Sequence, residues 1–336
     1  MEDIKSNNLN QENNWNEIKF DVLKIDNIIK KEKTYKEGEN IFEFFKEYDI
    51  KQEEQDQKID IPKYIAKIKS NSFEYLGILS KNLKKENYGY NLFENGDEYF
   101  GTWNKDKKEG YGIYFFKEDD NENIIKQIYI GEFKNNVKSG EGLYFKVSKF
   151  DEEKKQDNFM PPLDYTLVIG NFSEDNFIKG KIFSMEDGKR KIYKGKMNKD
   201  GKKNDDKAEI YEDENKIFYG IVKENSMMEG RIIIMKDGKK ENSYYFTKKG
   251  NNSIDADIDF DYEKGEKDDE KYIKKLNELN NSFQNENIQE LFINAMKIRE
   301  EVKASNNFEY MKDLDYDGVK QSLKDKYGNY LYIIQG

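Results

Sequence analysis

The chain has 336 residues, of which 38% are charged, 35% hydrophobic and 14% aromatic, and its formal net charge is −10. It contains neither cysteine nor histidine, which excludes disulfides, thiolate or imidazole metal sites, and catalysis that depends on those two residues. Its 22 phenylalanines and 24 tyrosines are far more than disordered chains carry, so we expect it to fold around aromatic side chains. Acidic residues are in excess at both ends and the middle is nearly neutral, which favours protein partners and argues against nucleic acid.

The first 72 residues predict a helical or irregular N-terminal flank. A helix over 15–30 is indicated by apolar residues three or four positions apart, namely Trp15, Ile18, Val22, Ile25 and Ile29. Ile18, Phe20 and Val22 also alternate, so a strand over the same residues stays open. A capping box that begins at Asn40 predicts a second helix. The acidic start predicts no targeting peptide, and the longest apolar runs are too short to span a membrane, which favours the cytosol.

Residues 73–250 contain about six copies of an aromatic–glycine unit. The leading glycines of successive copies lie 24, 30, 39, 25 and 25 residues apart, and periods of this size are typical of repeat architectures. A longer insertion, near 143–167, is expected to be either disordered or a docking loop. The residues that define the most regular copies are Tyr75, Gly77, Tyr99, Gly101, Trp103, Gly110, Tyr111, Gly112, Tyr129, Gly131, Phe133, Gly140 and Gly142.

Each unit predicts a β-hairpin. In Tyr99-x-Gly101-x-Trp103 the three named residues alternate, so they share one face of a strand, and the glycine leaves room for a neighbouring ring. A polar link over 104–109 is expected to follow, with the return strand starting at Gly110. Because an isolated hairpin is barely stable, we expect the units to stack into an elongated, twisted antiparallel sheet.

Two units resemble MORN (membrane occupation and recognition nexus) repeats. They are Tyr99-x-Gly101-x-Trp103 with Gly110-x-Gly112, and Tyr129-x-Gly131-x-Phe133 with Gly140-x-Gly142. The resemblance extends over about 73–250, although the units from Val168 onward lack the Gly-x-Gly pair. It implies a scaffold of stacked hairpins, and similar proteins occur in axonemal radial spokes, in the cortical cytoskeleton and at membrane junctions.

Residues 251–336 predict an acidic, helical C-terminal tail. Two short helices or one bent helix are expected over 267–304, either covering sheet edges or binding a partner helix. Two acidic loops resemble incomplete calcium sites. One runs from Asp255 to Glu266, and the other begins with Asp313, Asp315 and Asp317 but has a lysine in the position of the last ligand.

Together these features predict a non-catalytic scaffold that binds other proteins, with no cofactor and an undetermined oligomeric state. A narrow ribbon offers shallow grooves, whereas catalysis by paired carboxylates needs a deep pocket. The resemblance implies a ciliary or cortical cytoskeletal complex, with the most regular rings acting either as partner contacts or as stacking core. The alternative is a membrane adaptor that binds anionic phospholipid through lysine clusters at 189–191 and 202–203.

Overall fold

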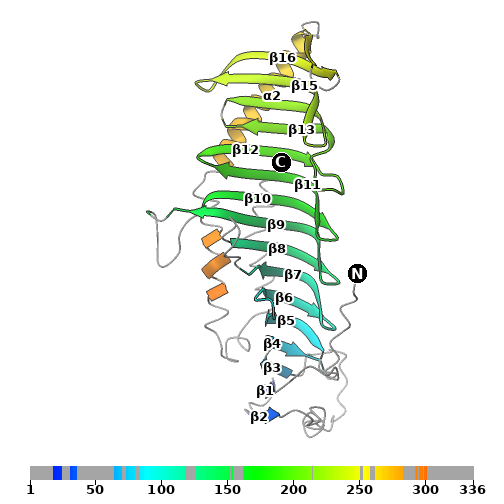
Figure 1. The fold of residues 1–336 in the computed structure, drawn as a ribbon, viewed down its shortest axis with the longest axis vertical. Coiled ribbons are helices and arrows are strands. Elements are labelled where there is room, and N and C mark those ends of the chain that lie inside the picture. The colour runs from blue at the N-terminus through cyan, green and yellow to red at the C-terminus, as the bar shows by residue number, and fades with distance from the viewer. Residues whose placement is uncertain are drawn as a thin grey trace, which may run out of the picture. The chain divides into compact units, whose positions relative to one another are not determined.

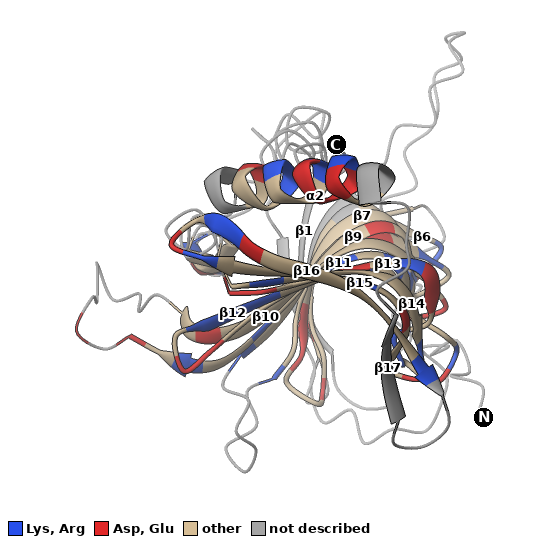
Figure 2. Cartoon of the chain, turned by 90° about the horizontal axis from the view of Figure 1, so that it is seen from above, with Lys and Arg blue, Asp and Glu red and all other residues tan. Residues whose placement is uncertain are grey.

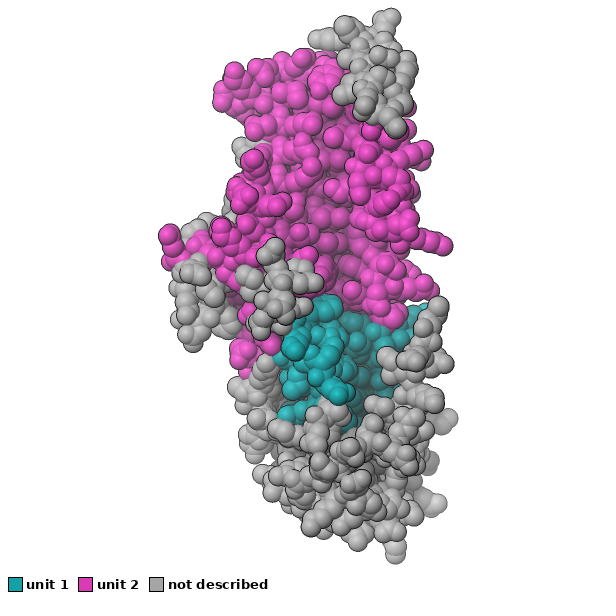
Figure 3. Space-filling model, viewed as in Figure 1, with its two compact units in different colours: residues 1–117, 133–136, 304–320 teal, residues 118–132, 137–303, 321–336 magenta. Residues whose placement is uncertain are grey.

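The structure is a computed structural model in two compact units, which Figure 3 distinguishes by colour. It describes residues 18–24, 31–35, 64–69, 73–80, 84–117, 126–151, 153, 162–213, 215–249, 253–257, 262–282, 292–293, 295–297 and 299–300. Of these, unit 1 comprises the residues up to 117 together with 133–136, and unit 2 comprises the others. The predicted helix after Asn40 lies outside the described residues, as does the acidic loop at Asp313, Asp315 and Asp317.

Unit 1 is an antiparallel sheet. Its strands are β1 (Ile18–Lys24), β2 (Lys31–Tyr35), β3 (Tyr64–Lys69), β4 (Glu74–Leu79), β5 (Lys85–Leu92), β6 (Glu98–Asn104) and β7 (Lys107–Phe115). β1 pairs with both β2 and β3, and from β3 to β7 each strand pairs with the next. The helix predicted over 15–30 is therefore wrong for 18–24, which form a strand. The alternation of Ile18, Phe20 and Val22 predicted this strand, whereas the helical spacing did not.

Unit 2 is also an antiparallel sheet of strands that follow one another in the chain. Its strands are β8 (Lys126–Lys134, whose last two residues belong to unit 1), β9 (Val137–Phe150), β10 (Pro162–Ser173), β11 (Asn176–Glu186), β12 (Lys189–Lys196), β13 (Asp205–Glu212), β14 (Lys216–Lys223), β15 (Ser226–Lys236), β16 (Lys239–Lys249) and β17 (Ser253–Asp257). From β9 to β17 every strand pairs antiparallel with the next. Much of the insertion expected at 143–167 is therefore strand, because β9 and β10 pair from Phe150 back to Gly140.

The turns are shorter than the sequence predicts. Lys105 and Asp106 form a two-residue turn with φ of 48° and 68°, and Asn135–Asn136, Glu174–Asp175 and Glu224–Asn225 have the same geometry. Positive φ at both residues is typical of the type I′ turn, which suits asparagine and aspartate. The six-residue link at 104–109 is therefore wrong. Gly110 lies inside β7 with φ of 80°, next to a register shift in the pairing with β6.

Helix α2 (Tyr262–Ser282) lies across one face of the unit 2 sheet (Figures 1 and 2). Leu276 and Leu279 are buried against that face, so α2 covers the face of the sheet and does not protect its edge. Further on, residues 292–293, 295–297 and 299–300 are helical, and Phe292 contacts Phe145 and Phe150 of β9. The apolar side of α2 is thus occupied by its own sheet.

The mainly antiparallel β fold is confirmed, and the C-terminal helix is present. The division of the chain at residues 72 and 250 stays a prediction, and strands β1 to β3 and β17 lie outside the predicted repeat region. Among the described residues, no helix is both long and apolar enough to cross a bilayer.

Candidate functional site

The predicted site residues of unit 1 form a ring–glycine stack. Tyr99 is completely buried, and its ring lies over Gly101 and Gly112, which face each other across β6 and β7. A Cβ atom on Gly112 would come within 2.7 Å of the Tyr99 Cζ atom. The Tyr99 hydroxyl donates a hydrogen bond to the Thr102 carbonyl at 3.0 Å. The stack therefore requires glycine on both strands and closes the unit with a hydrogen bond.

Two further aromatic rings complete the packing, one from β6 itself and one from β8. Trp103 contacts Tyr99 edge-to-face at 5.1 Å, and its indole N–H donates to the Gly89 carbonyl at 3.1 Å. Phe133 also contacts Tyr99 edge-to-face, with ring centres 5.1 Å apart. This geometry is the favourable one for aromatic pairs. Each ring of the predicted pattern thus serves the hairpin that carries it and the neighbouring hairpin.

The same stack recurs along the chain. Tyr75, Tyr129 and Tyr193 each donate from the hydroxyl to the carbonyl three residues later, at 2.9, 3.1 and 2.6 Å. Glycines face each other across paired strands in the degenerate units as well, at Gly170 with Gly180 and at Gly220 with Gly230. The single glycines of those units thus find partners across the sheet.

The other predicted residues have distinct roles. Gly77 lies under Tyr75, and Gly131 and Gly142 lie under Tyr129. Gly140 has φ of 64° and occupies the position in β9 that Gly110 has in β7, whereas Tyr111 is only half-buried. Because Tyr75, Tyr99, Trp103, Tyr129 and Phe133 are at most 5% exposed, the structure places these rings in the core.

A lysine covers the tyrosine ring in each of the stacks at Tyr75, Tyr99, Tyr129 and Tyr193, which the spacing of rings and glycines does not predict. Lys85 lies 4.9 Å from the ring centre of Tyr75, and Lys203 lies at the same distance from that of Tyr193. Lys108 lies 5.7 Å from Tyr99 and 4.3 Å from Tyr114, and Lys138 lies 5.7 Å from Tyr129. These cation–π contacts favour the charged ammonium over the ring face. The available signal was a lysine four residues before the second glycine in three of the units.

The turn of the next hairpin holds each of these lysines in place. The Lys85 N–H donates to Asp106 Oδ1 at 2.8 Å, while the Asp106 N–H donates to the Lys85 carbonyl at 3.1 Å. The same reciprocal pair joins Lys108 to Asn136, Lys138 to Asp175 and Lys203 to Asn225. The second turn residue therefore sets the spacing between hairpins, which explains its restriction to aspartate or asparagine.

The contact between α2 and the sheet is charged at its centre. Asp269 is buried, and its two oxygens accept hydrogen bonds from Arg231 Nε at 2.7 Å and Nη2 at 3.0 Å. Lys240 contacts both Asp269 and Glu266, and Tyr219 stacks on Tyr272 with ring centres 4.0 Å apart. Burial alone would raise the pKa of Asp269, but the hydrogen bonds and charges of Arg231 and Lys240 hold it below its usual value.

The lysine clusters predicted for lipid binding are largely engaged within the sheet. Lys191 pairs with Glu212 at 2.6 Å, and Lys202 pairs with Glu224 at 2.8 Å. Lys203 is the residue that covers the ring of Tyr193. These contacts reduce the free positive charge that either cluster can offer to an anionic surface.

The described part of the first acidic loop does not have the form of a calcium loop. Asp255 and Asp257 lie in β17, which pairs with β16, and Glu266 lies in α2 and accepts hydrogen bonds from Lys240. Among the residues that the structure describes, no three acidic side chains are grouped so that they could hold a metal ion.

These features define a class of protein: an array of β-hairpins in which buried rings, paired glycines and turn residues repeat. The MORN repeat family model matches residues 99–120 and 129–148, the two units in which this geometry is most regular. The chain therefore contains MORN repeats at these two places. A search of the curated proteins finds no significant match.

Proposed function

We propose that this chain is a non-catalytic scaffold that binds other proteins along its array of hairpins. The observation that carries the proposal is the repetition of one rigid stack, in which each tyrosine is fixed by paired glycines and each covering lysine by the next turn. Side chains that could do chemistry, such as Asp269, Glu266 and Lys240, are engaged in holding α2 on its sheet. A rigid, repeated surface suits the task of holding partners at set spacings.

We further propose a place in a cytoplasmic assembly, either the ciliary axoneme or the cortical cytoskeleton. The support for this placement is analogy with proteins that carry MORN repeats. Because the rings are core, partners would contact the outward-facing polar residues and the turn residues between strands.

The alternative is an adaptor that binds anionic phospholipid through 189–191 and 202–203. The ion pairs of Lys191 and Lys202 count against it, because a lipid headgroup would have to compete with Glu212 and Glu224.

Affinity purification of the tagged full chain from its native cells tests the scaffold directly. We expect cytoskeletal or axonemal proteins to co-purify in fixed ratio and to remain bound after detergent extraction. Recovery of the chain alone, or loss of all partners once membranes are dissolved, would contradict the proposal.

Sedimentation with vesicles separates the two candidates. We expect little pelleting with vesicles that contain phosphatidylserine at physiological salt, and no difference between the wild-type chain and a Lys189→Gln, Arg190→Gln, Lys191→Gln variant. Strong, salt-sensitive pelleting that the triple variant loses would favour the membrane adaptor.

A further inference from the structure

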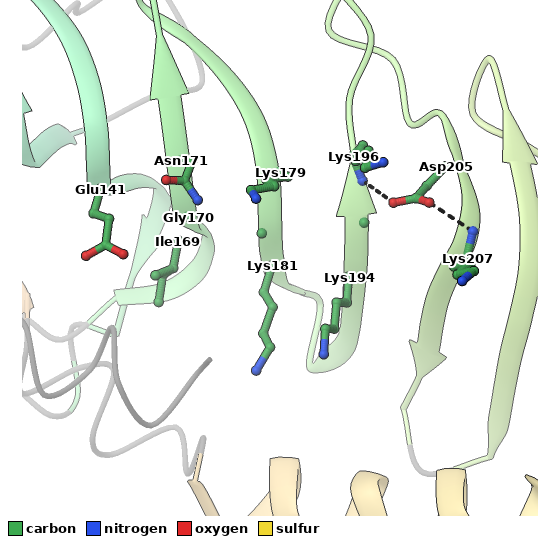
Figure 4. Close-up of a pocket in the computed structure, with 12 residues that line it drawn as sticks. Glu141, Ile169, Gly170, Asn171, Lys179, Lys181, Lys194, Lys196, Asp205 and Lys207 are labelled. Carbon is green, nitrogen blue, oxygen red and sulfur yellow. Dashed lines mark hydrogen bonds between the residues drawn. The ribbon is translucent and has the colours of Figure 1, made fainter. Parts of the chain in front are cut away.

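A cavity of about 420 Å³ opens in unit 2, on strands β9 to β13. Figure 4 shows its lining side chains, with Lys181 and Lys194 extending toward α2. The lining includes five lysines, Lys179, Lys181, Lys194, Lys196 and Lys207, but only two acids, Glu141 and Asp205. The cavity is therefore electropositive, and its volume is in the range of small-molecule sites.

Lys181 is the unusual member of this lining. Its side chain is only 3% exposed, and no described residue forms a hydrogen bond or an ion pair with its ammonium group. Burial and the charges of Lys194 and Lys275 lower the pKa of Lys181 to about 8, and Glu209 opposes this effect. A buried ammonium without hydrogen-bond acceptors is costly, so this residue is not explained by the stability of the fold.

Glu209, the acid whose charge acts on Lys181, already has other partners for both of its carboxylate oxygens. One of its oxygens accepts from Lys275 at 2.8 Å and lies 4.0 Å from Lys194, and the other accepts from the Tyr211 hydroxyl at 2.7 Å. Three ammonium groups thus share a single carboxylate. An arriving anion with close to two negative charges would balance this excess, and a phosphate monoester carries about −1.5 to −2 at neutral pH.

We propose that this cavity binds a small phosphorylated molecule whose phosphate oxygens accept hydrogen bonds from Lys181 and Lys194. Lysine is a common point-charge partner for phosphate. The space exceeds what a phosphate group alone fills, which leaves room for a polar body beside Asn171 and Asp205. The two Asp205 oxygens accept backbone N–H bonds from Lys196 and Lys207, both at 2.9 Å and drawn in Figure 4. Asp205 is thereby fixed, and its remaining acceptor positions suit a ligand hydroxyl.

The burial of Lys181 favours a soluble ligand over a lipid headgroup. A flat bilayer reaches exposed lysines, such as Lys196 and Lys207, more easily than one that is 3% exposed. The site is separate from the clusters at 189–191 and 202–203, and it does not depend on the scaffold function proposed above.

The test compares the full chain with Lys181→Met and with the matched control Lys189→Met, which removes an exposed lysine of β12. Inorganic phosphate, pyrophosphate and glycerol 3-phosphate are the probes, with chloride and sulfate at equal ionic strength as references. We expect each phosphate probe to raise the melting temperature of the wild type and of Lys189→Met. For Lys181→Met, titration calorimetry should show an affinity for these phosphate probes that is weaker by roughly 10- to 100-fold. This is the effect expected when one hydrogen bond to a charged group is lost.

The melting temperature of Lys181→Met without ligand shows whether weaker binding could result from misfolding. Because Lys181→Met removes a buried, unpaired charge, its melting temperature without ligand should equal or exceed that of the wild type. A parallel arm uses vesicles that contain phosphatidic acid: pelleting that depends on Lys181, without a response to the soluble probes, would assign the phosphate to a lipid headgroup. Equal stabilisation by sulfate, an undiminished response in Lys181→Met, or no response in either arm would overturn the proposal.

Discussion

Tyr129 shows what a single residue contributes to the repeat. Its ring is fully buried over Gly131 and Gly142 and packs edge-to-face with Phe172 at a centre distance of 5.2 Å, and its hydroxyl donates to the Glu132 carbonyl. The pattern of an aromatic residue two positions before glycine predicted that these residues share a face. It could not predict that the ring would turn back over its own glycine, because that depends on the glycine of the next strand.

Replacing the second glycine should therefore disrupt the stack. In Gly142→Ala the new Cβ would lie 2.7 Å from Tyr129 Cε2, and we expect a loss of about 1–3 kcal/mol in the free energy of unfolding from overpacking. The matched control is Gly188→Asn in the same unit, where nothing lies within 4 Å and asparagine accepts the left-handed turn conformation. Urea denaturation measures both, and equal losses would refute the ring–glycine stack.

Lys85 shows the electrostatic side of the same unit. Burial lowers its pKa to about 8, against the opposing charge of Asp106, and the ring faces of Tyr75 and Trp103 help to keep it protonated. Between about pH 8 and 10.5 the unfolded chain holds the proton of this lysine more firmly than the folded chain does.

The folded state should consequently gain stability from this residue as the pH rises through that window. The free energy of unfolding of the wild type should rise by at most about 3 kcal/mol relative to that of Lys85→Met, which follows from the size of the pKa shift of Lys85. Denaturation at a series of pH values measures it, and Lys134→Met, an exposed lysine of β8, supplies the reference. A difference between wild type and Lys85→Met that stays flat, or that falls with pH, would contradict the account.

Helix α2 is held in place by contacts between residues that are far apart in the chain. Its apolar spacing predicted a helix near the right place, and the helix is observed at 262–282. The sequence could not reveal that Asp269 pairs with Arg231, because the two are far apart in the chain and joined only by the fold. Nor could spacing decide the N-terminal flank, where period-two and helical patterns coexist and strand pairing with β2 and β3 prevails at β1.

Breaking the buried pair should loosen α2. Asp269→Asn leaves Arg231 and Lys240 without their carboxylate partner, and removing one member of a buried pair costs about 3–5 kcal/mol. Hydrogen exchange should become faster in α2 and in the facing strands β14 to β16. Glu278→Gln, which removes an exposed pair with Lys274 on the same helix, should change exchange little. Similar exchange in both variants would show that the pair does not hold the helix.

At the scale of the whole molecule, the repeat is more regular in space than in sequence. The family model matches two units, yet opposed glycines recur at Gly170 with Gly180 and at Gly220 with Gly230, where the sequence pattern is weak. The turn residues and ring-covering lysines were also missed, because their partners lie in the next hairpin and no pattern within one unit contains both. The spacing of the glycines was enough to predict the fold class. It could not predict the electropositive cavity, because the residues that line it come from five different strands.

Small-angle X-ray scattering of the full chain tests the central claim most directly. Hairpins that stack edge to edge predict an elongated particle, with a skewed distribution of interatomic distances and a radius of gyration well above the ~20 Å expected for a compact globule of this length. A symmetric distribution with a radius of gyration near ~20 Å would contradict an array of hairpins that stack edge to edge.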